Sequence, residues 1–365
     1  MKIFLKTYGC QMNVRDSELV CGLLQKNGYQ IIQNLQKADV VLFNTCSVRQ
    51  HAEDRVFSEI GKLKILKEKN PNLIIGVIGC MAQNHRDKIF KRASVVDLVC
   101  GPNDIDSIPL LIKKARSGHA DNISANKAKR EESVYNTRYN FDKNHSFVVI
   151  SEGCNNFCSY CVVPFVRGRE RSRDFNDVLS EIKSLVKKGI KDITLLGQNV
   201  NSYNAGVSFI ELLKKVNEIK GLISFTFFTS HPKDVTRDLF IAMHDLKKLK
   251  KLLHLPIQSG SDRILKLMNR GYSVKHYKEI VGLYRKIVPN GNISTDVIVG
   301  FPTETKRDFQ KSLNLFKEIK FDAAYIFKYS PRPHTKAAQL VDDVPRIEKE
   351  RRHKIILDLQ REMGK

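Results

Sequence analysis

Short apolar runs alternate along the chain with amphipathic stretches of helical period, which predicts an α/β architecture. In the first third, the amphipathic segments 16–28 and 53–69 separate apolar runs of strand length. Because each run is followed by a helical pattern, we expect a parallel α/β domain. The strands predicted for this N-terminal domain are 2–9, 38–45, 72–79 and 95–100.

The second part of the chain repeats the alternation of strand and helix. Residues 117–144 are polar without a clear period and predict a linker, which gives domains at 1–116 and 145–365. After the linker, helical stretches such as 175–189 and 305–320 separate six apolar runs. Six sequential strand–helix units predict a partial (β/α)6 barrel. Its predicted strands are 147–153, 192–198, 223–229, 251–257, 293–300 and 323–329.

Composition and charge narrow the class of protein. A chain of 365 residues with 42% hydrophobic content can bury a large core in two domains. The N-terminal KIFLKTYGCQMN is too short and too polar for a signal peptide, and the apolar run 73–82 is well short of a membrane span. We therefore expect a cytoplasmic protein with no membrane partner. The net charge of +23 favours a polyanion such as nucleic acid, although a lysine-rich solvated surface is the alternative.

Three of the eight cysteines are crowded into the stretch GCNNFCSYCV, at spacing C-x3-C-x2-C: Cys154, Cys158 and Cys161. Cytosolic thiols stay reduced, so metal binding is a better interpretation than disulfides. Structural zinc and ordinary ferredoxin clusters take four protein ligands, and His145 and His231 have no spacing that recommends them as the fourth. Three thiolates on a 4Fe–4S cluster leave one iron open for a substrate.

A second group of cysteines is dispersed in the first domain. Cys10, Cys46 and Cys80 each end a predicted strand, and ligands gather outside the carboxyl ends of parallel strands. These thiols could therefore converge, the alternative being that they are ordinary buried core cysteines. Cys21 falls inside a predicted helix and reads as core, whereas Cys100 also ends a strand and stays open as a fourth ligand.

C-x3-C-x2-C after the first strand of a partial barrel resembles the radical S-adenosylmethionine (SAM) enzymes. The resemblance implies that the open iron chelates SAM, whose reductive cleavage yields a 5′-deoxyadenosyl radical. Tyr160, directly before Cys161, matches the position that lies against the adenine. The cofactor supplies the difficult chemistry, and the protein orients and shields it.

The resemblance extends over nearly the whole chain. TYGCQMN, NTCSVR, GCMAQ, EGCNNFCSYC, LLGQNVNSY, HLPIQSGS, STDVIVGFPTET and YSPRP together resemble the tRNA methylthiotransferases of the MiaB type. NTCSVR and LLGQNVNSY favour the isopentenyladenosine branch over relatives that act on threonylcarbamoyladenosine in tRNA or on an aspartate of a ribosomal protein.

The family resemblance carries implications for cofactors and partners. It implies a second 4Fe–4S cluster on Cys10, Cys46 and Cys80, with Cys100 as a bystander, and two uses of SAM: methylation of a cluster-bound sulfur and generation of the radical that activates C2 of the adenine. The expected partners are tRNA and an electron donor of the flavodoxin or ferredoxin type, and we expect a monomer. The positions matching SAM contacts are Tyr160, Gly197, Gln198, Gln258 and Ser259.

The sequence departs from the family pattern in three places. The sequence ends at QREMGK, so we expect a protein without the strand-rich TRAM domain with which the family usually binds RNA, and His334 and Thr303 stand where glycine is usual. A glycine at position 334 would permit a positive φ, so the loop there could differ in conformation, the alternative being that both changes are neutral drift. This expected absence keeps a second hypothesis open, that of a truncated, non-catalytic iron–sulfur or tRNA-binding protein.

Four arginines alternate just after the cysteine motif, in VRGRERSRD. In an extended segment they would point to one face, and guanidinium groups suit phosphate, so we expect Arg167 and Arg169 to contact tRNA. A salt-bridged surface with Glu170 and Asp174 is the alternative. The full set is Arg167, Arg169, Arg171 and Arg173.

Overall fold

The computed structural model describes residues 1–47, 50–119, 122–137 and 139–363, and it divides into two compact units. The first unit comprises 1–143 and 162–168, and the second comprises 144–161 and 169–365. The segment 162–168, directly after the cysteine motif, thus packs with the first unit although the sequence predicted a single boundary. Val48 and Arg49 of the motif NTCSVR lie outside the described residues.

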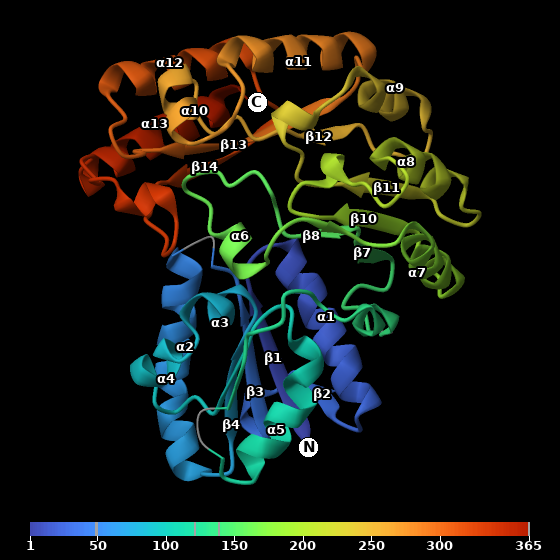
Figure 1. Cartoon of the computed structure of the whole chain (residues 1–365), viewed down its shortest axis with the longest axis vertical. Helices are drawn as coiled ribbons and strands as arrows, with labels where there is room; N and C mark the ends of the chain where they lie inside the picture. The colour runs from blue at the N-terminus through green and yellow to red at the C-terminus, as the bar shows by residue number, and fades with distance from the viewer. Residues whose placement is uncertain (48–49, 120–121, 138, 364–365) are drawn as a thin grey trace. The chain divides into compact units, whose positions relative to one another are not determined.

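The first unit is built on one parallel sheet with strand order β2-β1-β3-β4-β5-β6. Helices α1 and α5 cover one face of the sheet and α2, α3 and α4 the other (Figure 1). All four strands predicted for this domain are present, and they fill the centre of the sheet. The elements are β1 Lys2–Tyr8, α1 Gln11–Lys26, β2 Gln30–Ile32, β3 Val40–Thr45, α2 Gln50–Lys69, β4 Ile74–Ile78, α3 Cys80–His85, α4 Lys88–Arg92, β5 Leu98–Cys100, α5 Ile108–Arg116, β6 Asn122–Ser124 and, after the cysteine motif, α6 Val163–Val166.

Two predictions for the first unit need correction. Part of the predicted linker 117–144 forms β6, which pairs in parallel with β5, and Asn122 Nδ2 donates to the carbonyl of His119 at 2.7 Å. A strand of three residues is too short to show a period, so the sequence could not reveal it. Helix α1 begins at Gln11, whereas the sequence predicted a start at Asp16. Asp16 and Ser17 resemble a helix cap in the sequence, but both are buried inside the helix, where their side chains belong to a polar network.

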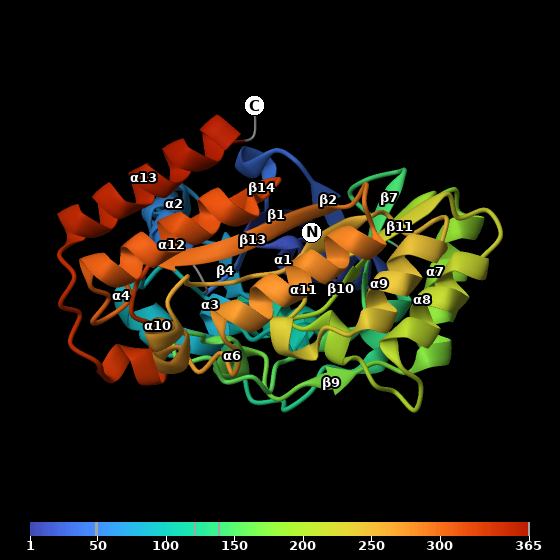
Figure 2. The same ribbon diagram turned by 90° about the horizontal axis from the view of Figure 1, so that it is seen from above.

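The second unit contains the six predicted parallel strands, in two three-stranded sheets of order β11-β10-β7 and β12-β13-β14. The sheets are joined because Phe225 N donates to the carbonyl of Lys248 and Lys250 N donates to that of Phe225, both at 2.9 Å. Helices α7, α8, α9, α11 and α12 lie along the outside of the strands (Figure 2). The elements are β7 His145–Val149, β8 Ser151–Glu152, β9 Arg171–Ser172, α7 Phe175–Lys187, β10 Asp192–Leu196, α8 Phe209–Glu218, β11 Ser224–Phe227, α9 Arg237–Asp245, β12 Leu252–His254, α10 Asp262–Leu267, α11 Val274–Ile287, β13 Asn292–Val299, α12 Lys306–Ile319, β14 Ala323–Lys328 and α13 Arg346–Met363.

Local sequence explains where several of these helices begin. The side chain of Asp174 caps α7 by accepting from two backbone amides, and reciprocal capping boxes start α8 at Ser208 and α12 at Thr305. Each cap satisfies backbone donors that the first helical turn leaves without a partner.

At the two positions where the family usually has glycine, the backbone adopts a conformation that glycine takes up more easily than other residues. Thr303 has φ +66° and His334 has φ +68°, both in the left-handed region. The loop at His334, which could have differed, therefore holds this residue in a left-handed conformation. Thr303 is β-branched, so it holds this conformation at a cost that the surrounding hydrogen bonds offset: its carbonyl accepts from Arg263, and its amide donates to Asp343 at 2.6 Å.

None of the helices in the described part of the chain is both long and apolar enough to cross a bilayer.

Candidate functional site

The first candidate site lies where three neighbouring strands of the first unit end. Cys10 follows β1, Cys46 follows β3 and Cys80 follows β4, and β1, β3 and β4 are adjacent in the sheet. The strand order reverses between β1 and β3, which makes this edge the topological switch point where open α/β sheets bind ligands. Cys10 is exposed, and a hydrogen bond to Cys46 lowers the pKa of its thiol to about 6. The three thiols expected to converge do lie together.

Glycines make room for this convergence. Gly9 and Gly79 directly precede Cys10 and Cys80, and a Cβ on Gly9 would lie 2.8 Å from the Cβ of Cys46. A Cβ on Gly79, whose φ is +87°, would lie 2.2 Å from the side-chain oxygen of Asn44. Both contacts are closer than real Cβ atoms allow, so the turns that bring two of the three cysteines together require glycine.

A buried arginine faces the first cysteine set. Arg167 forms a hydrogen bond to the Cys80 thiol, and its charge lowers the pKa of both Cys80 and Cys10, although burial leaves the pKa of Cys80 raised. The guanidinium also pairs with Asp16 at 2.5 Å, and Arg130 binds the other oxygen of the same carboxylate at 2.7 Å. Asp16 keeps a lowered pKa because these two charges outweigh its burial.

This arrangement corrects the prediction that Arg167 and its neighbours form one tRNA-facing row. Arg167 is bound to Asp16 within its own unit, and Arg173 is bound to Glu181 at 2.7 Å. Arg171 lies 3.6 Å from Glu152. Arg167 belongs to the first unit, whereas Arg169, Arg171 and Arg173 belong to the second. Only Arg169 is exposed, with its guanidinium 5.5 Å from the ring of Phe157.

The two cysteines predicted to be bystanders are buried away from this set. Cys21 lies within α1, and burial raises the pKa of its thiol to about 12. Cys100 ends β5, and its thiol donates to the carbonyl of Asp104 at 3.2 Å, while burial raises its pKa well above the ordinary value.

The second candidate site is the loop 153–161, which follows β8 at the carboxyl end of the second unit's strands. Gly153 starts the loop with φ +75°, and its amide donates to the side chain of Gln198. Cys161 N donates to the carbonyl of Cys158 at 2.9 Å, so the loop closes as a tight turn. The predicted contact residue Gln198 thus supports the loop that carries the cysteines.

Sequence reasoning missed a second buried arginine, which faces this loop. Arg270 donates to the Cys158 sulfur at 3.3 Å and to the carbonyl of Pro256 at 2.9 Å. Its charge partly offsets the burial that raises the pKa of Tyr160 well above its ordinary value. Tyr160 is half-buried among the side chains of Met268 and Phe301. No local motif surrounds Arg270, so only the fold brings it to the cysteines.

Buried polar atoms without a protein partner mark the mouth of the second unit. Asn199 follows β10, Ser230 and His231 follow β11, and Gln258 follows β12, and each carries a buried polar side-chain atom for which the described residues supply no hydrogen-bond partner. Ser151 Oγ, in β8, is another. Since buried polar groups are normally satisfied, these groups at successive strand ends fit a polar ligand such as SAM.

The other predicted contact residues lie in the same region. Gln258 holds φ +69°, and Ser259 beside it is fully buried. A Cβ on Gly197 would lie 2.2 Å from the hydroxyl of Ser151, so a side chain there would fill space beside one of the unpartnered groups. Their direct contact with SAM stays a prediction.

The two histidines considered as fourth ligands have other roles. His145 starts β7, at the amino end of the strands, and its Nε2 pairs with the hydroxyl of Thr194 at 2.8 Å. His231 lies at the carboxyl end, where burial, with Arg270 and Lys233, lowers its pKa to about 2. His231 is therefore a neutral ring whose Nδ1 accepts from Lys233 N at 3.3 Å.

Within the described residues, no three cysteine, histidine or carboxylate side chains take up the spacing of ligands around a single metal ion. The ligands of a 4Fe–4S cluster bind different irons and stand further apart than ligands of one ion. Three thiols with one buried arginine in each unit therefore fit a cluster better than zinc.

Comparison with known proteins assigns each unit to a protein family. Residues 2–101 match the family model UPF0004, described as an uncharacterized protein family, and residues 148–316 match the radical SAM superfamily. Among solved structures, the radical SAM methyltransferase TsrM from Kitasatospora setae superposes with a TM-score of 0.68 at 12% identity, covering 92% of this chain and 75% of that one. The fold and the cysteine loop thus define a radical SAM protein with a UPF0004 domain in front of the barrel.

Curated relatives narrow the class. A protein of Thermoanaerobacter sp. (strain X514) is 47% identical over 99% of this chain and 78% of its own length, and one of Clostridium botulinum (strain Hall) is 45% identical over 100% and 82%. A third, from Neisseria gonorrhoeae (strain NCCP11945), is 45% identical over 96% and 81%. All three are named tRNA-2-methylthio-N(6)-dimethylallyladenosine synthase. The chain belongs to this family, and the names favour the isopentenyladenosine branch over its two alternatives.

Proposed function

We propose that this protein is a radical SAM methylthiotransferase that converts N6-isopentenyladenosine next to the tRNA anticodon to its 2-methylthio derivative. Two observations support the proposal together: the family named above, and the presence in each unit of a three-cysteine set at the carboxyl ends of parallel strands. An electron carrier or a simple tRNA-binding protein has no need for two sets that each leave an iron open.

The chain's own residues divide the work between the units. Cys154, Cys158 and Cys161 hold one 4Fe–4S cluster, and the unpartnered polar groups at the mouth of the barrel bind and orient SAM. Cys10, Cys46 and Cys80 hold a second cluster. When bound, the first cluster with SAM supplies the radical that activates C2 of the adenine, and the second presents the sulfur that is methylated and transferred. We expect the protein to act as a monomer that receives electrons from a flavodoxin or ferredoxin.

The experiment that tests this function is anaerobic reconstitution of the wild-type chain and of two triple alanine variants, one for each cysteine set. We expect about eight irons per wild-type chain and about four in each variant, since each cluster holds four. Incubation with SAM, reductant and isopentenylated tRNA should give the 2-methylthio nucleoside by mass spectrometry with the wild type alone.

The variants distinguish the parts of the proposal. The variant that lacks Cys10, Cys46 and Cys80 should still cleave SAM to 5′-deoxyadenosine, whereas the other should not. Full iron loading in the first variant would rule out the second cluster. An intact protein that forms 5′-deoxyadenosine but modifies tRNA lacking the isopentenyl group equally well would contradict the proposed substrate.

A further inference from the structure

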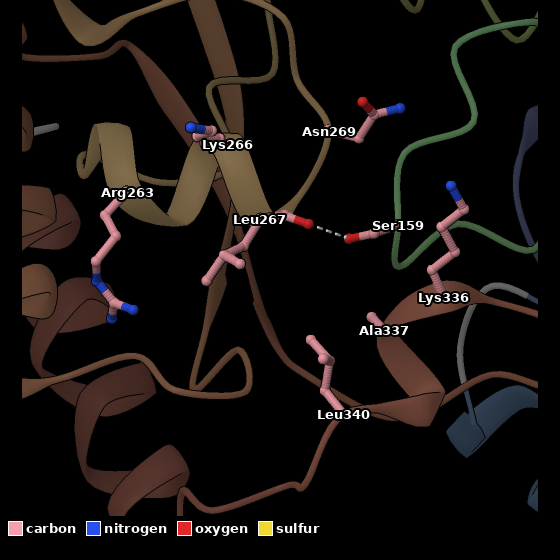
Figure 3. A pocket seen from close by; sticks show the side chains of 8 residues that line it. All are labelled: Ser159, Arg263, Lys266, Leu267, Asn269, Lys336, Ala337 and Leu340. Atoms are coloured by element: carbon pink, nitrogen blue, oxygen red, sulfur yellow. Dashed lines mark hydrogen bonds between the residues drawn. The ribbon is translucent and has the colours of Figure 1, made fainter.

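A cavity of about 600 Å³ in the second unit lies beside the loop that carries the cysteines (Figure 3). Helix α10 and Asn269, two residues beyond its end, form one wall, and the segment 336–340 forms another. Ser159, which stands between Cys158 and Cys161, lies where the two walls meet. The residues that line it are Ser159, Arg263, Lys266, Leu267, Asn269, Lys336, Ala337 and Leu340.

Hydrogen bonds connect the cavity wall directly to the cysteine loop. Ser159 Oγ donates to the carbonyl of Leu267 at 2.7 Å, and its carbonyl accepts from Ala337 N at 2.8 Å. The side-chain amide of Asn269 donates to the carbonyls of Asn156 and Phe157 at 3.2 and 3.1 Å. Leu267 on the cavity wall is therefore hydrogen-bonded to Ser159, which follows Cys158 directly in the chain.

The cavity is cationic, and its charge is not neutralised by the protein. Among the described residues, Lys266 and Lys336 have no carboxylate partner, whereas Arg263 is paired with Asp308 at 2.5 Å. Both lysines are exposed, Lys266 on the α10 wall of the cavity and Lys336 on the opposite wall (Figure 3).

Apolar side chains are exposed in the same place. Leu267 is 38% exposed and Leu340 is 39% exposed, both on the cavity wall, and Phe157 in the cysteine loop is 37% exposed. Small apolar contacts within a charged rim are typical of protein–protein interfaces, and a bare phosphate site would not require them.

We propose that this surface is the docking site of the electron donor, an acidic protein that carries one electron at a time. The inference rests on the proposed function, which requires a one-electron reductant for the cluster of this unit. Electron transfer slows steeply with distance, so the donor must dock where the cysteine loop meets the surface. Lys266 and Lys336 attract and orient an acidic partner. In the step itself, the donor is oxidised by one electron, the cluster is reduced by one, and no bond is made.

The test measures electron transfer from a flavodoxin of negative net charge in its hydroquinone form to the reconstituted full-length protein. Appearance of the flavin semiquinone is followed by stopped flow at low salt. In Lys266→Glu/Lys336→Glu we expect the rate to fall about tenfold or more and to depend less on salt, because opposite charges accelerate docking of such partners by at least this factor. Reduction by dithionite should not change, since that small reductant needs no docking surface.

A matched control is provided by Lys183 and Lys187, which are exposed on α7 and carry the same charge. Lys183→Glu/Lys187→Glu should keep a rate within about twofold of the wild type, because the net charge changes equally but the docking surface does not. The neutral variant Lys266→Gln/Lys336→Gln should give an intermediate rate. This variant keeps the test valid if the charge-reversal variant does not fold.

Two outcomes would overturn the inference. Flavodoxin could reduce the cavity variant and the control at equal rates. The variant could instead lose tRNA affinity at an unchanged reduction rate, which would make the cavity an RNA site. The iron content of the wild type is measured before the kinetic experiment. A wild type that forms no cluster would contradict the proposed function.

Discussion

One buried arginine accompanies each cysteine set. Arg167 bonds Cys80 in the first unit, and Arg270 bonds Cys158 in the second. As cluster ligands, three thiolates would concentrate negative charge in one place, and a guanidinium would stabilise them with strong, charge-assisted hydrogen bonds. Burying an arginine is itself costly, so each one needs further partners: Asp16 for Arg167, and the carbonyl of Pro256 for Arg270.

His231 gives a prediction about pH at the level of a single residue. The pKa of His231 is about 2 in the folded protein and near 6.5 in the unfolded chain. Below pH 6.5 the unfolded chain therefore binds a proton at this ring, whereas the folded chain does not. The stability of the second unit should therefore fall by about 2 kcal/mol between pH 7 and pH 5 on this account. His231→Asn, which keeps an acceptor for Lys233 N, should lose that part of the pH dependence.

Urea unfolding at both pH values measures the difference. His276, which is half-exposed on α11, supplies the control: His276→Asn should retain the wild-type dependence. An identical pH dependence in His231→Asn and the wild type would show that the ring is not held neutral by burial.

At the scale of elements, α6 and the residue after it contribute to a site that the sequence order would not assign to them. The segment 162–168 leaves the second unit directly after Cys161 and packs its Val162 and Val166 against Cys80. This packing places Arg167, the C-cap of α6, beside the first cysteine set. The same segment thus follows one cysteine set in sequence and belongs to the other in space.

The charge of Arg167 should raise the reduction potential of the proposed first-unit cluster, because a positive charge favours the reduced, more negative form. In the variant that lacks Cys154, Cys158 and Cys161, Arg167→Gln should lower the potential, by about 60 mV for each tenfold loss of preference for the reduced form. Arg167→Lys should recover part of the shift. The reduction potential is measured by redox titration, with electron paramagnetic resonance as the readout. Arg270→Gln is the control and should leave the potential of this cluster unchanged. Equal shifts in the Gln and Lys variants would indicate a structural role only.

At the scale of the whole molecule, the net charge of +23 dominates the encounter with RNA. The arginine run 167–173 should contribute less to RNA binding than its sequence suggests, since three of its four arginines are paired with carboxylates. Arg169 is the exposed member and the remaining candidate for a phosphate contact. Binding of tRNA should therefore depend on many dispersed cations and weaken steeply as salt rises.

Arg169→Glu tests the remaining phosphate contact. We expect weaker binding to all tRNAs alike, with the slope of log affinity against log salt reduced by about one, as for the loss of a single phosphate contact. Filter binding over a range of salt concentrations measures both quantities. Lys187→Glu, the same change of charge sign on α7, should leave the slope nearly unchanged, and an equal effect of the two variants would mean that Arg169 makes no specific contact.

The sequence by itself determined the architecture and most of the chemistry. Strand and helix periods are local, so ten of the strands and the partial barrel could be predicted, and cysteine spacing and strand ends indicated both three-cysteine sets. Tertiary structure alone decided which charges act at these sites. Arg167 meets Asp16 and Arg270 meets Cys158 across more than a hundred residues of chain, and burial makes His231 neutral. Such contacts have no local period or spacing, because they arise only when distant segments pack and exclude water.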